Sequence, residues 1–227
     1  MFPLLTPFHP TPPAPPAGLP LELDSAFGAL RGEARSMLER RYVDGGLSLS
    51  KERPAGGSGQ EVVCTAREGE RLVGTLSVRL DGRSGLNADL LFREELATWR
   101  GAGVRLCEFG GLAVDRHSQQ PRLVLARLFH LGYLHAHRRW GSERLVIEVH
   151  PRHVAFYRRW LGLVPCATPR HNPRVQAPAA LMSIDFATVR EQIERWGGRP
   201  DLLRQARCLY PLAWDAATEA AMLKRLA

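Results

Sequence analysis

The chain has 227 residues, of which 44% are hydrophobic, and its formal net charge is +8. This length suits one domain with appendages. No apolar run reaches the length of a membrane span, and the N-terminus lacks the basic and apolar segments of a signal peptide, so we expect a cytoplasmic protein. The four cysteines form no CxxC pair and have no zinc-ligand spacing, so we expect no metal site.

Almost all of the positive charge comes from arginine, since Lys51 and Lys224 are the only lysines. This bias reflects either composition alone or an acidic partner, because a basic surface steers an acidic protein into encounter. No nucleic-acid recognition motif accompanies the charge, so we expect no nucleic-acid partner.

The first hundred residues are predicted to contain a tail, two helices and a hairpin. Residues 1–20 are rich in proline and are expected to form a flexible tail. A helix is predicted from Asp24 or Ser25 to Tyr42. After a Pro/Gly/Ser loop at 51–60, the apolar runs 61–66 and 71–80 predict a hairpin, and a short helix is predicted over 88–100.

Residues 104–115 are the centre of the prediction. Their sequence, VRLCEFGGLAVD, is that of a buried strand that contains one carboxylate, Glu108, and the pair Gly110-Gly111. A buried carboxylate is costly unless it is paired or has a task, and glycines inside a strand often mark a bulge or a close backbone approach to a ligand. The strand therefore predicts a base beside exposed backbone N–H groups.

A helix at 118–137 and a second buried strand at 144–149 follow. Strand, helix and strand at this spacing predict a βαβ unit with two parallel neighbouring strands. A helix is expected after residue 150, a last strand at 176–185, and helices at 186–196 and 200–227. We expect three segments: the tail at 1–20, one domain at 21–185 and a helical extension at 186–227.

This core resembles the GNAT acyltransferase superfamily in the order Leu-Ala-Val-Asp (112–115), helix, strand, then Phe156-Tyr157. The resemblance implies an α+β (α/β) fold with a mixed, mainly antiparallel sheet, a central parallel βαβ pair and flanking helices. Residues 74–81, Cys107-Glu108 and Pro-Arg-His (151–153) narrow the resemblance to the N-acyl amino acid synthase family, which is similar to the acyl-homoserine-lactone synthases.

The resemblance implies transfer of a long acyl chain from acyl carrier protein to the amine of an amino acid or related small molecule. The co-substrate is then an acyl-phosphopantetheine thioester, with no permanently bound cofactor. Glu108 falls on the strand glutamate of those synthases and is our candidate base. Backbone N–H groups at Gly110 and Gly111 would stabilise the oxyanion, and Tyr157 would protonate the leaving thiolate.

Further residues are expected to bind substrates. The candidates for binding the substrates, the acyl donor included, are Leu112, Val114, Arg116, Gln120, Arg122, Glu148, His150, His153 and Phe156. Glu148 or His150 could assist Glu108 or hold the carboxylate of the acceptor. Within the phosphate signature, Leu123 and Leu125 stand where glycines are usual, and Gly111 stands where the synthases carry arginine. Two alternatives therefore stay open: an acetyl-CoA-dependent N-acetyltransferase, and a non-catalytic module that binds acyl chains or acidic proteins. Homo-oligomer formation is also open.

Overall fold

A computed structural model describes residues 20–28, 32–44 and 60–226. The expectations for residues 1–19 and for most of the loop at 51–60 lie outside these ranges. The strands are β1 (Leu21–Phe27), β2 (Glu61–Glu68), β3 (Arg71–Leu80), β4 (Leu106–Val114), β5 (Arg144–Val149), β6 (Val164–Pro165), β7 (Arg170–Asn172) and β8 (Ala177–Asp185). The α-helices are α1 (Gly32–Asp44), α2 (Asp89–Gly101), α3 (Pro121–Tyr133), α4 (Val154–Leu161), α5 (Phe186–Trp196), α6 (Leu203–Ala206) and α7 (Ala216–Leu226).

The strands form one mixed sheet in the order β1-β2-β3-β4-β5-β8-β6, with β7 paired to β8. The β4–β5 pair is parallel and the other pairs are antiparallel. Helix α3 connects β4 to β5, so the predicted βαβ unit and the mixed, mainly antiparallel sheet are confirmed. The hairpin of β2 and β3 is also confirmed.

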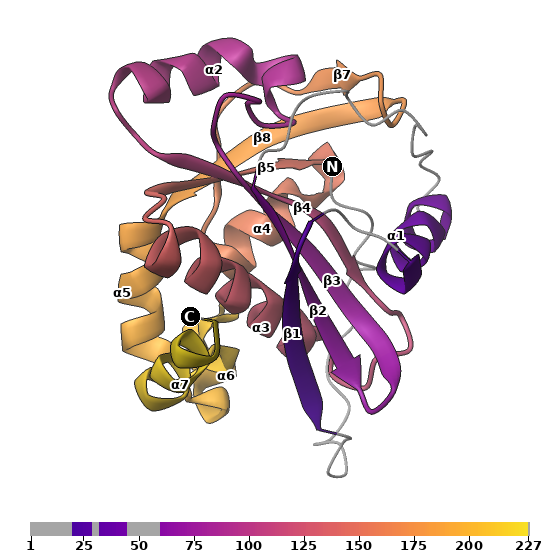
Figure 1. Cartoon of the computed structure of the whole chain (residues 1–227), viewed down its shortest axis with the longest axis vertical. Coiled ribbons are helices and arrows are strands. Elements are labelled where there is room, and N and C mark those ends of the chain that lie inside the picture. Colours follow the sequence, from indigo (N-terminus) through magenta and orange to yellow (C-terminus); the bar gives the residue numbers. More distant parts are fainter. Residues whose placement is uncertain (1–19, 29–31, 45–59, 227) are drawn as a thin grey trace.

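The two faces of the sheet carry separate layers of helices (Figure 1). On one face α3 packs on β2, β3 and β4, and the large core of the protein lies beneath it. On the other face α1 packs on β3 and β4 around Ala113, while α2 packs on β4, β5 and β8 around Leu106 and Val146. Because side chains alternate along a strand, β4 contributes to both layers, and the middle of β4 lies between α1 and α2.

Two predicted elements differ from the structure. The segment expected to begin a helix at Asp24 or Ser25 is the edge strand β1, paired with β2, and α1 begins only at Gly32. The helical segment expected over 200–227, with a turn signal at Pro211, consists of α6, α7 and two 3₁₀ turns. The short strands β6 and β7 were not predicted.

The C-terminal helices share the main core. Phe186, Ile193, Tyr210 and Trp214 are buried in the same cluster as the α3 side chains, so residues 186–226 pack as part of one body. None of the helices in the described part of the chain is long and apolar enough to cross a membrane.

Candidate functional site

A β-bulge interrupts the middle of β4. Thr75 of β3 pairs with Ala113, but Ser77, two residues further on, pairs with Gly110, so β4 holds one extra residue at this point. Gly111 has a φ of +56°, in the left-handed region that glycine adopts without steric cost. Its carbonyl oxygen accepts a hydrogen bond from the Thr75 hydroxyl at 2.9 Å. The Gly110-Gly111 pair therefore forms the predicted bulge.

The parallel pairing of β4 with β5 is short. It covers three residue pairs and ends where Glu108 meets Val146. Beyond this point β4 continues for six residues and β5 for three without pairing to each other. Backbone groups of the bulge therefore face a gap between two neighbouring strands of one sheet, and Glu108 lies where that gap begins.

Glu108 is buried, with 3% of its surface exposed. Its Oε2 accepts hydrogen bonds from the backbone N–H groups of Asn87 at 2.5 Å and Ala88 at 3.4 Å. Burial, and then the negative charge of Glu148, raise the pKa of Glu108 to about 7, although the Asn87 N–H and the Arg174 guanidinium oppose the rise. A carboxyl group with this pKa can accept a proton at neutral pH and release it again.

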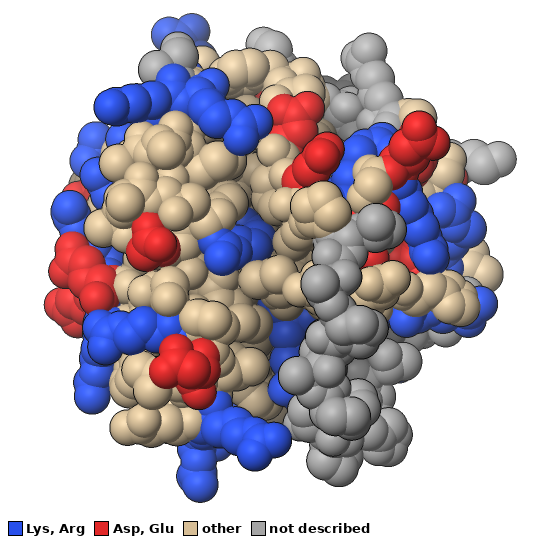
Figure 2. Space-filling view, turned by 90° about the horizontal axis from the view of Figure 1, so that it is seen from below, with Lys and Arg blue, Asp and Glu red and all other residues tan. Residues whose placement is uncertain are grey.

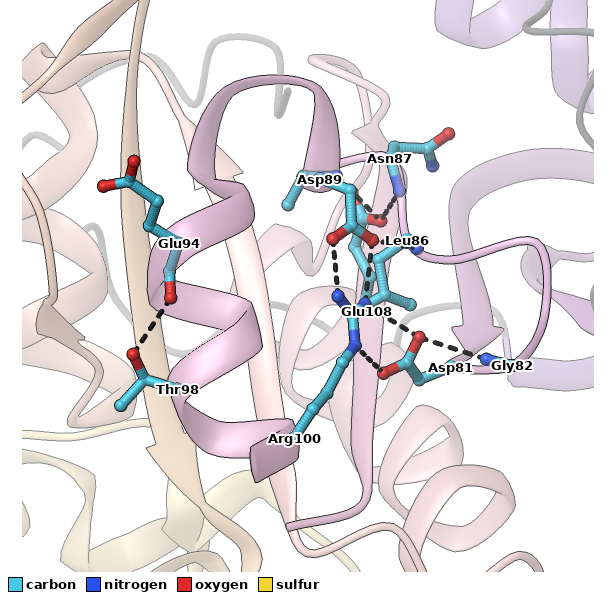
Figure 3. A network of polar contacts seen from close by, with 10 residues as sticks. Asp81, Gly82, Leu86, Asn87, Asp89, Glu94, Thr98, Arg100 and Glu108 are labelled. Atoms are coloured by element: carbon cyan, nitrogen blue, oxygen red, sulfur yellow. Dashed lines mark hydrogen bonds and ion pairs between the residues drawn. The ribbon is translucent and has the colours of Figure 1, made fainter. Parts of the chain in front are cut away.

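The loop before α2 is fixed by ionic contacts, which sets the position of the two N–H donors to Glu108. Arg100 of α2 binds both Asp81 and Asp89, at 2.6 Å each, and Asp89 Oδ2 accepts the Leu86 N–H at 2.7 Å (Figure 3). The three residues Leu86, Asn87 and Ala88 are therefore held against β4.

Glu148 of β5 lies on the same face of the sheet as Glu108, because Glu148 follows the Glu108 partner Val146 by two residues. Its Oε2 accepts a hydrogen bond from Asn172 Nδ2 at 2.8 Å and lies 3.8 Å from Arg174 Nη2. Arg174 also donates to the carbonyl oxygen and the side-chain oxygen of Asn87. The turn between β7 and β8 therefore contacts Glu148 directly, and it contacts Asn87, whose N–H donates to Glu108.

Free space adjoins Gly110. None of the described residues lies within 4 Å of the position that a Cβ at Gly110 would take. By alternation this position is on the Glu108 face of β4. Three buried polar atoms on that face, Ser77 Oγ, Arg79 Nε and Glu148 Oε1, have no hydrogen-bond partner among the described residues. This arrangement can accept a small polar ligand beside a base.

Other predicted residues of β4 and α4 lie in the α3-side core. Leu112, Val114 and Tyr157 are buried there, and Phe156 packs against the same cluster. The Tyr157 ring lies 6.5 Å from Phe129, on the opposite face from Glu108. Leu112 and Val114 can therefore meet a ligand only through their backbone, and the role of Tyr157 stays a prediction.

The predicted phosphate-binding arginines are separated. Arg116 lines a groove of about 570 Å³ between α1 and the β4–α3 loop, together with Arg40, Arg41 and His117. Arg122 instead places its guanidinium 5.3 Å from the Trp160 ring centre. Gln120 precedes α3 and is half-buried, without a side-chain capping bond to the helix.

The two predicted histidines lie beside Arg152 of the same loop. His150 Nδ1 accepts the Arg152 N–H at 3.3 Å, and His153 Nε2 accepts Arg152 Nε–H at 3.2 Å. Burial, and then the charge of Arg152, lower the pKa of His153 to about 4, and the same two causes lower that of His150. Both rings are therefore neutral at pH 7 and accept hydrogen bonds locally.

The sequence prediction missed Ser77, Asn87, Asn172 and Arg174. Ser77 is a polar residue within an apolar strand, which is the same signal that drew attention to Glu108. Asn172 and Arg174 stand in an Asn-Pro-Arg turn that only strand pairing brings to the site. Among the described residues, no three histidines, cysteines or carboxylates are grouped as for a metal ion.

Arginines are distributed widely on the surface. Figure 2 shows Lys and Arg side chains in several groups, both at the rim and in the middle of one face, with Asp and Glu groups among them. The described residues of this face therefore present several separate basic areas.

Comparison with known proteins identifies the chain. The family model of the N-acyl amino acid synthase FeeM matches residues 33–185, more than half of the chain. The structure of FeeM, an N-acyl amino acid synthase from uncultured soil microbes, has 26% sequence identity and a TM-score of 0.63, covering 75% of this chain and 94% of FeeM. None of the curated proteins matches the chain.

More distant solved structures are similar at lower scores. An acyl-CoA N-acyltransferase from Pseudomonas aeruginosa has 15% identity and a TM-score of 0.46, covering 71% of this chain and 99% of its own. The acyl-homoserine-lactone synthase LasI has 14% identity and a TM-score of 0.45, covering 74% and 91%. The family model covers more than half of the chain, and the chain therefore belongs to the FeeM family of N-acyl amino acid synthases, which are N-acyltransferases of the GNAT fold.

Proposed function

We propose that this N-acyltransferase moves a fatty acyl group from acyl carrier protein to the amine of an amino acid. The observation that carries the proposal is Glu108, a buried carboxyl group with a pKa near 7 at the point where β4 and β5 part. The space beside Gly110 adjoins it on the same face. An amine placed there meets a base and a bulged backbone at once.

Glu108 is the proposed general base. It removes a proton from the acceptor ammonium, directly or through one water, as the nitrogen approaches the thioester carbonyl. Backbone N–H groups of the bulge at Gly110, Gly111 and Leu112 stabilise the oxyanion. Tyr157 is the predicted donor of a proton to the leaving thiolate.

The donor is proposed to be a carrier-bound phosphopantetheine thioester. The groove with Arg40, Arg41 and Arg116 opens where β4 meets α3, and arginine binds phosphate through charge-assisted hydrogen bonds. Acyl carrier protein is acidic, which suits a chain with a net charge of +8.

Mass spectrometry of the products tests this function. The full chain is mixed with pooled amino acids and with C8 to C16 acyl groups, each supplied on acyl carrier protein and separately on CoA. We expect N-acyl amino acids from the carrier-bound donors. Glu108→Gln should lower kcat by about 100-fold or more, the range of general-base effects, while Glu143→Gln, which removes an exposed carboxylate bonded to Arg105, should not.

Each component of the proposal can fail separately. Product from acyl-CoA alone would overturn the carrier protein as donor. Acylation of amines other than amino acids would overturn the acceptor class. Equal rates for Glu108→Gln and the native chain would remove Glu108 as the base.

A further inference from the structure

The site contains two buried carboxylates where one general base is sufficient. Glu108 and Glu148 are 3% and 1% exposed, and they lie on the same face of adjacent parallel strands. Two like charges this close in a buried site are unfavourable unless a cation or a proton lies between them. The second carboxylate therefore requires an explanation.

Three arginines of the described part of the chain lie around the pair, and two of them are bound to other carboxylates. From the β7–β8 turn, Arg174 serves both sides of the site, at 3.8 Å from Glu148 and bonded to Asn87. From β3, Arg79 lies opposite Glu108 in the strand pairing, but its Nη2 is paired with Glu61 at 3.1 Å. From α2 and the loop before it, Arg100 is bound to Asp81 and Asp89. Among the described residues, Arg174 is thus the guanidinium that contacts the pair, through Glu148, while the other two arginines are paired with other carboxylates.

Glu148 also has an unused hydrogen-bond acceptor. Asn172 donates a hydrogen bond to Oε2 and Arg174 forms an ion pair with the same oxygen. The buried Oε1 has no hydrogen-bond partner among the described residues. A buried carboxylate oxygen without a donor is rare, and it indicates that a donor arrives with a ligand. The free space beside Gly110 lies on the same face of the sheet.

We propose that Glu148 holds the acceptor as an ammonium cation beside Glu108 and keeps Glu108 basic enough to deprotonate it. This inference rests on the proposed function and adds a positioning residue to it: a second carboxylate that holds the ammonium group of the acceptor. The ammonium supplies a positive charge between the two carboxylates and a hydrogen-bond donor for Glu148 Oε1, which has no partner in the described part of the chain.

The protons balance as follows. The ammonium R–NH₃⁺ gives one proton to the Glu108 carboxylate and becomes R–NH₂. The nitrogen lone pair forms the C–N bond and the C–S bond breaks, with its electron pair on sulfur. Of the two remaining N–H protons, one goes to the thiolate and one stays on the amide. The Glu108 proton is then released to solvent.

Titration of Glu108 tests the inference without any need for turnover. The protein is labelled with ¹³C at the glutamate carboxyl carbon, and the Glu108 signal is identified by its loss in Glu108→Gln. We expect Glu148→Gln to lower the Glu108 midpoint by about one pH unit or more, because a like charge is removed. Arg174→Gln should raise the midpoint, because an opposite charge is removed. Glu68→Gln, a buried carboxylate at the far end of β2, is the matched control and should leave it unchanged.

Kinetics give the second readout. In Glu148→Gln the acidic limb of kcat/KM for the amine should move to lower pH, and KM for the amine should rise while KM for the acyl donor stays constant. The 2-hydroxy acid in which a hydroxyl replaces the amine of the acceptor lacks the ammonium group. We expect the native chain to bind this analogue more weakly than the amino acid, and we expect the two affinities to become similar in Glu148→Gln.

The outcomes separate the two proposals. An unchanged Glu108 midpoint in both Glu148→Gln and Arg174→Gln overturns this inference even if acyl transfer is intact. Absence of N-acyl product from the native chain overturns the proposed function whatever the titration shows. Since Arg174 is half-buried in a turn, its variant keeps the test available if Glu148→Gln fails to fold.

Discussion

The bulge in β4 depends on one backbone angle, that of Gly111, with φ at +56°. An L-residue in this region costs about 1–2 kcal/mol. We therefore expect Gly111→Ala to lower the free energy of unfolding by about that amount in urea denaturation, and to lower kcat as the bulge N–H groups shift. Gly110→Ala is the matched control for stability alone, since its Cβ meets open space. Equal stability losses in the two variants would show that the bulge does not depend on Gly111.

Single residues divide into those that the sequence reveals and those that it does not. Glu108 and the Gly110-Gly111 pair were predicted because each is unusual within its own apolar strand. Asn172 and Arg174 were not, because an Asn-Pro-Arg turn is typical of any loop and becomes part of a site only when β8 pairs with β5. The local sequence pattern therefore predicts the candidate base, Glu108, but does not predict the residues of the β7–β8 turn that contact its surroundings.

At the scale of elements, α3 lies unusually close to the sheet. A Cβ on Gly132 would lie 2.8 Å from the Phe109 ring and 3.0 Å from Leu76 Cδ2. Alanine favours a helix over glycine by about 1 kcal/mol, but overpacking a filled core costs about 1–3 kcal/mol. We expect Gly132→Ala to lower the midpoint of urea unfolding. Gly101→Ala, at the open end of α2, should leave the midpoint unchanged or raise it, and the reverse order would contradict this packing.

The elements that were predicted well are those specified locally. The βαβ unit joins two apolar runs by a helix of ordinary length, so neighbouring residues are enough to define it. The edge strand β1 was mistaken for the start of a helix because Phe27 and residues 30–42 supply apolar positions at helical spacing. The alternation of apolar residues at Leu21 and Leu23 indicates a strand only once the seven residue pairs with β2, about forty residues away in the sequence, are known.

For the whole molecule, buried histidines set the dependence of stability on pH. Burial lowers the pKa of His135 and His153 to about 4 and also lowers that of His130, from an ordinary 6.5. As the pH falls below 6.5, these histidines become protonated in the unfolded chain but stay neutral in the folded chain. Because the unfolded chain then binds more protons, the free energy of unfolding falls. Glu108 acts in the opposite sense between about 4.5 and 7, because the folded chain holds its proton, but it opposes these three buried histidines and also His150, whose pKa is lowered too.

Urea denaturation at pH 5 and pH 7 checks this balance. We expect lower stability at pH 5, and a larger difference between the two pH values in Glu108→Gln, which removes the opposing group. His117→Gln, an exposed position, should leave the difference unchanged. Stability that stays constant or rises on acidification would contradict the assignment of these histidines as neutral in the folded chain.

Strand order has a consequence for synthesis on the ribosome. β8 lies between β5 and β6, although it is the last strand to be made. When residues 144–165 emerge, the strand that pairs with both of their segments has not yet been translated. Nascent β5 must therefore keep one edge unpaired until residue 185 is added, and β6 has no described partner before then. A chain that stalls before residue 177 would carry the bulged strand and Glu108 without a closed sheet, and it would expose an aggregation-prone edge.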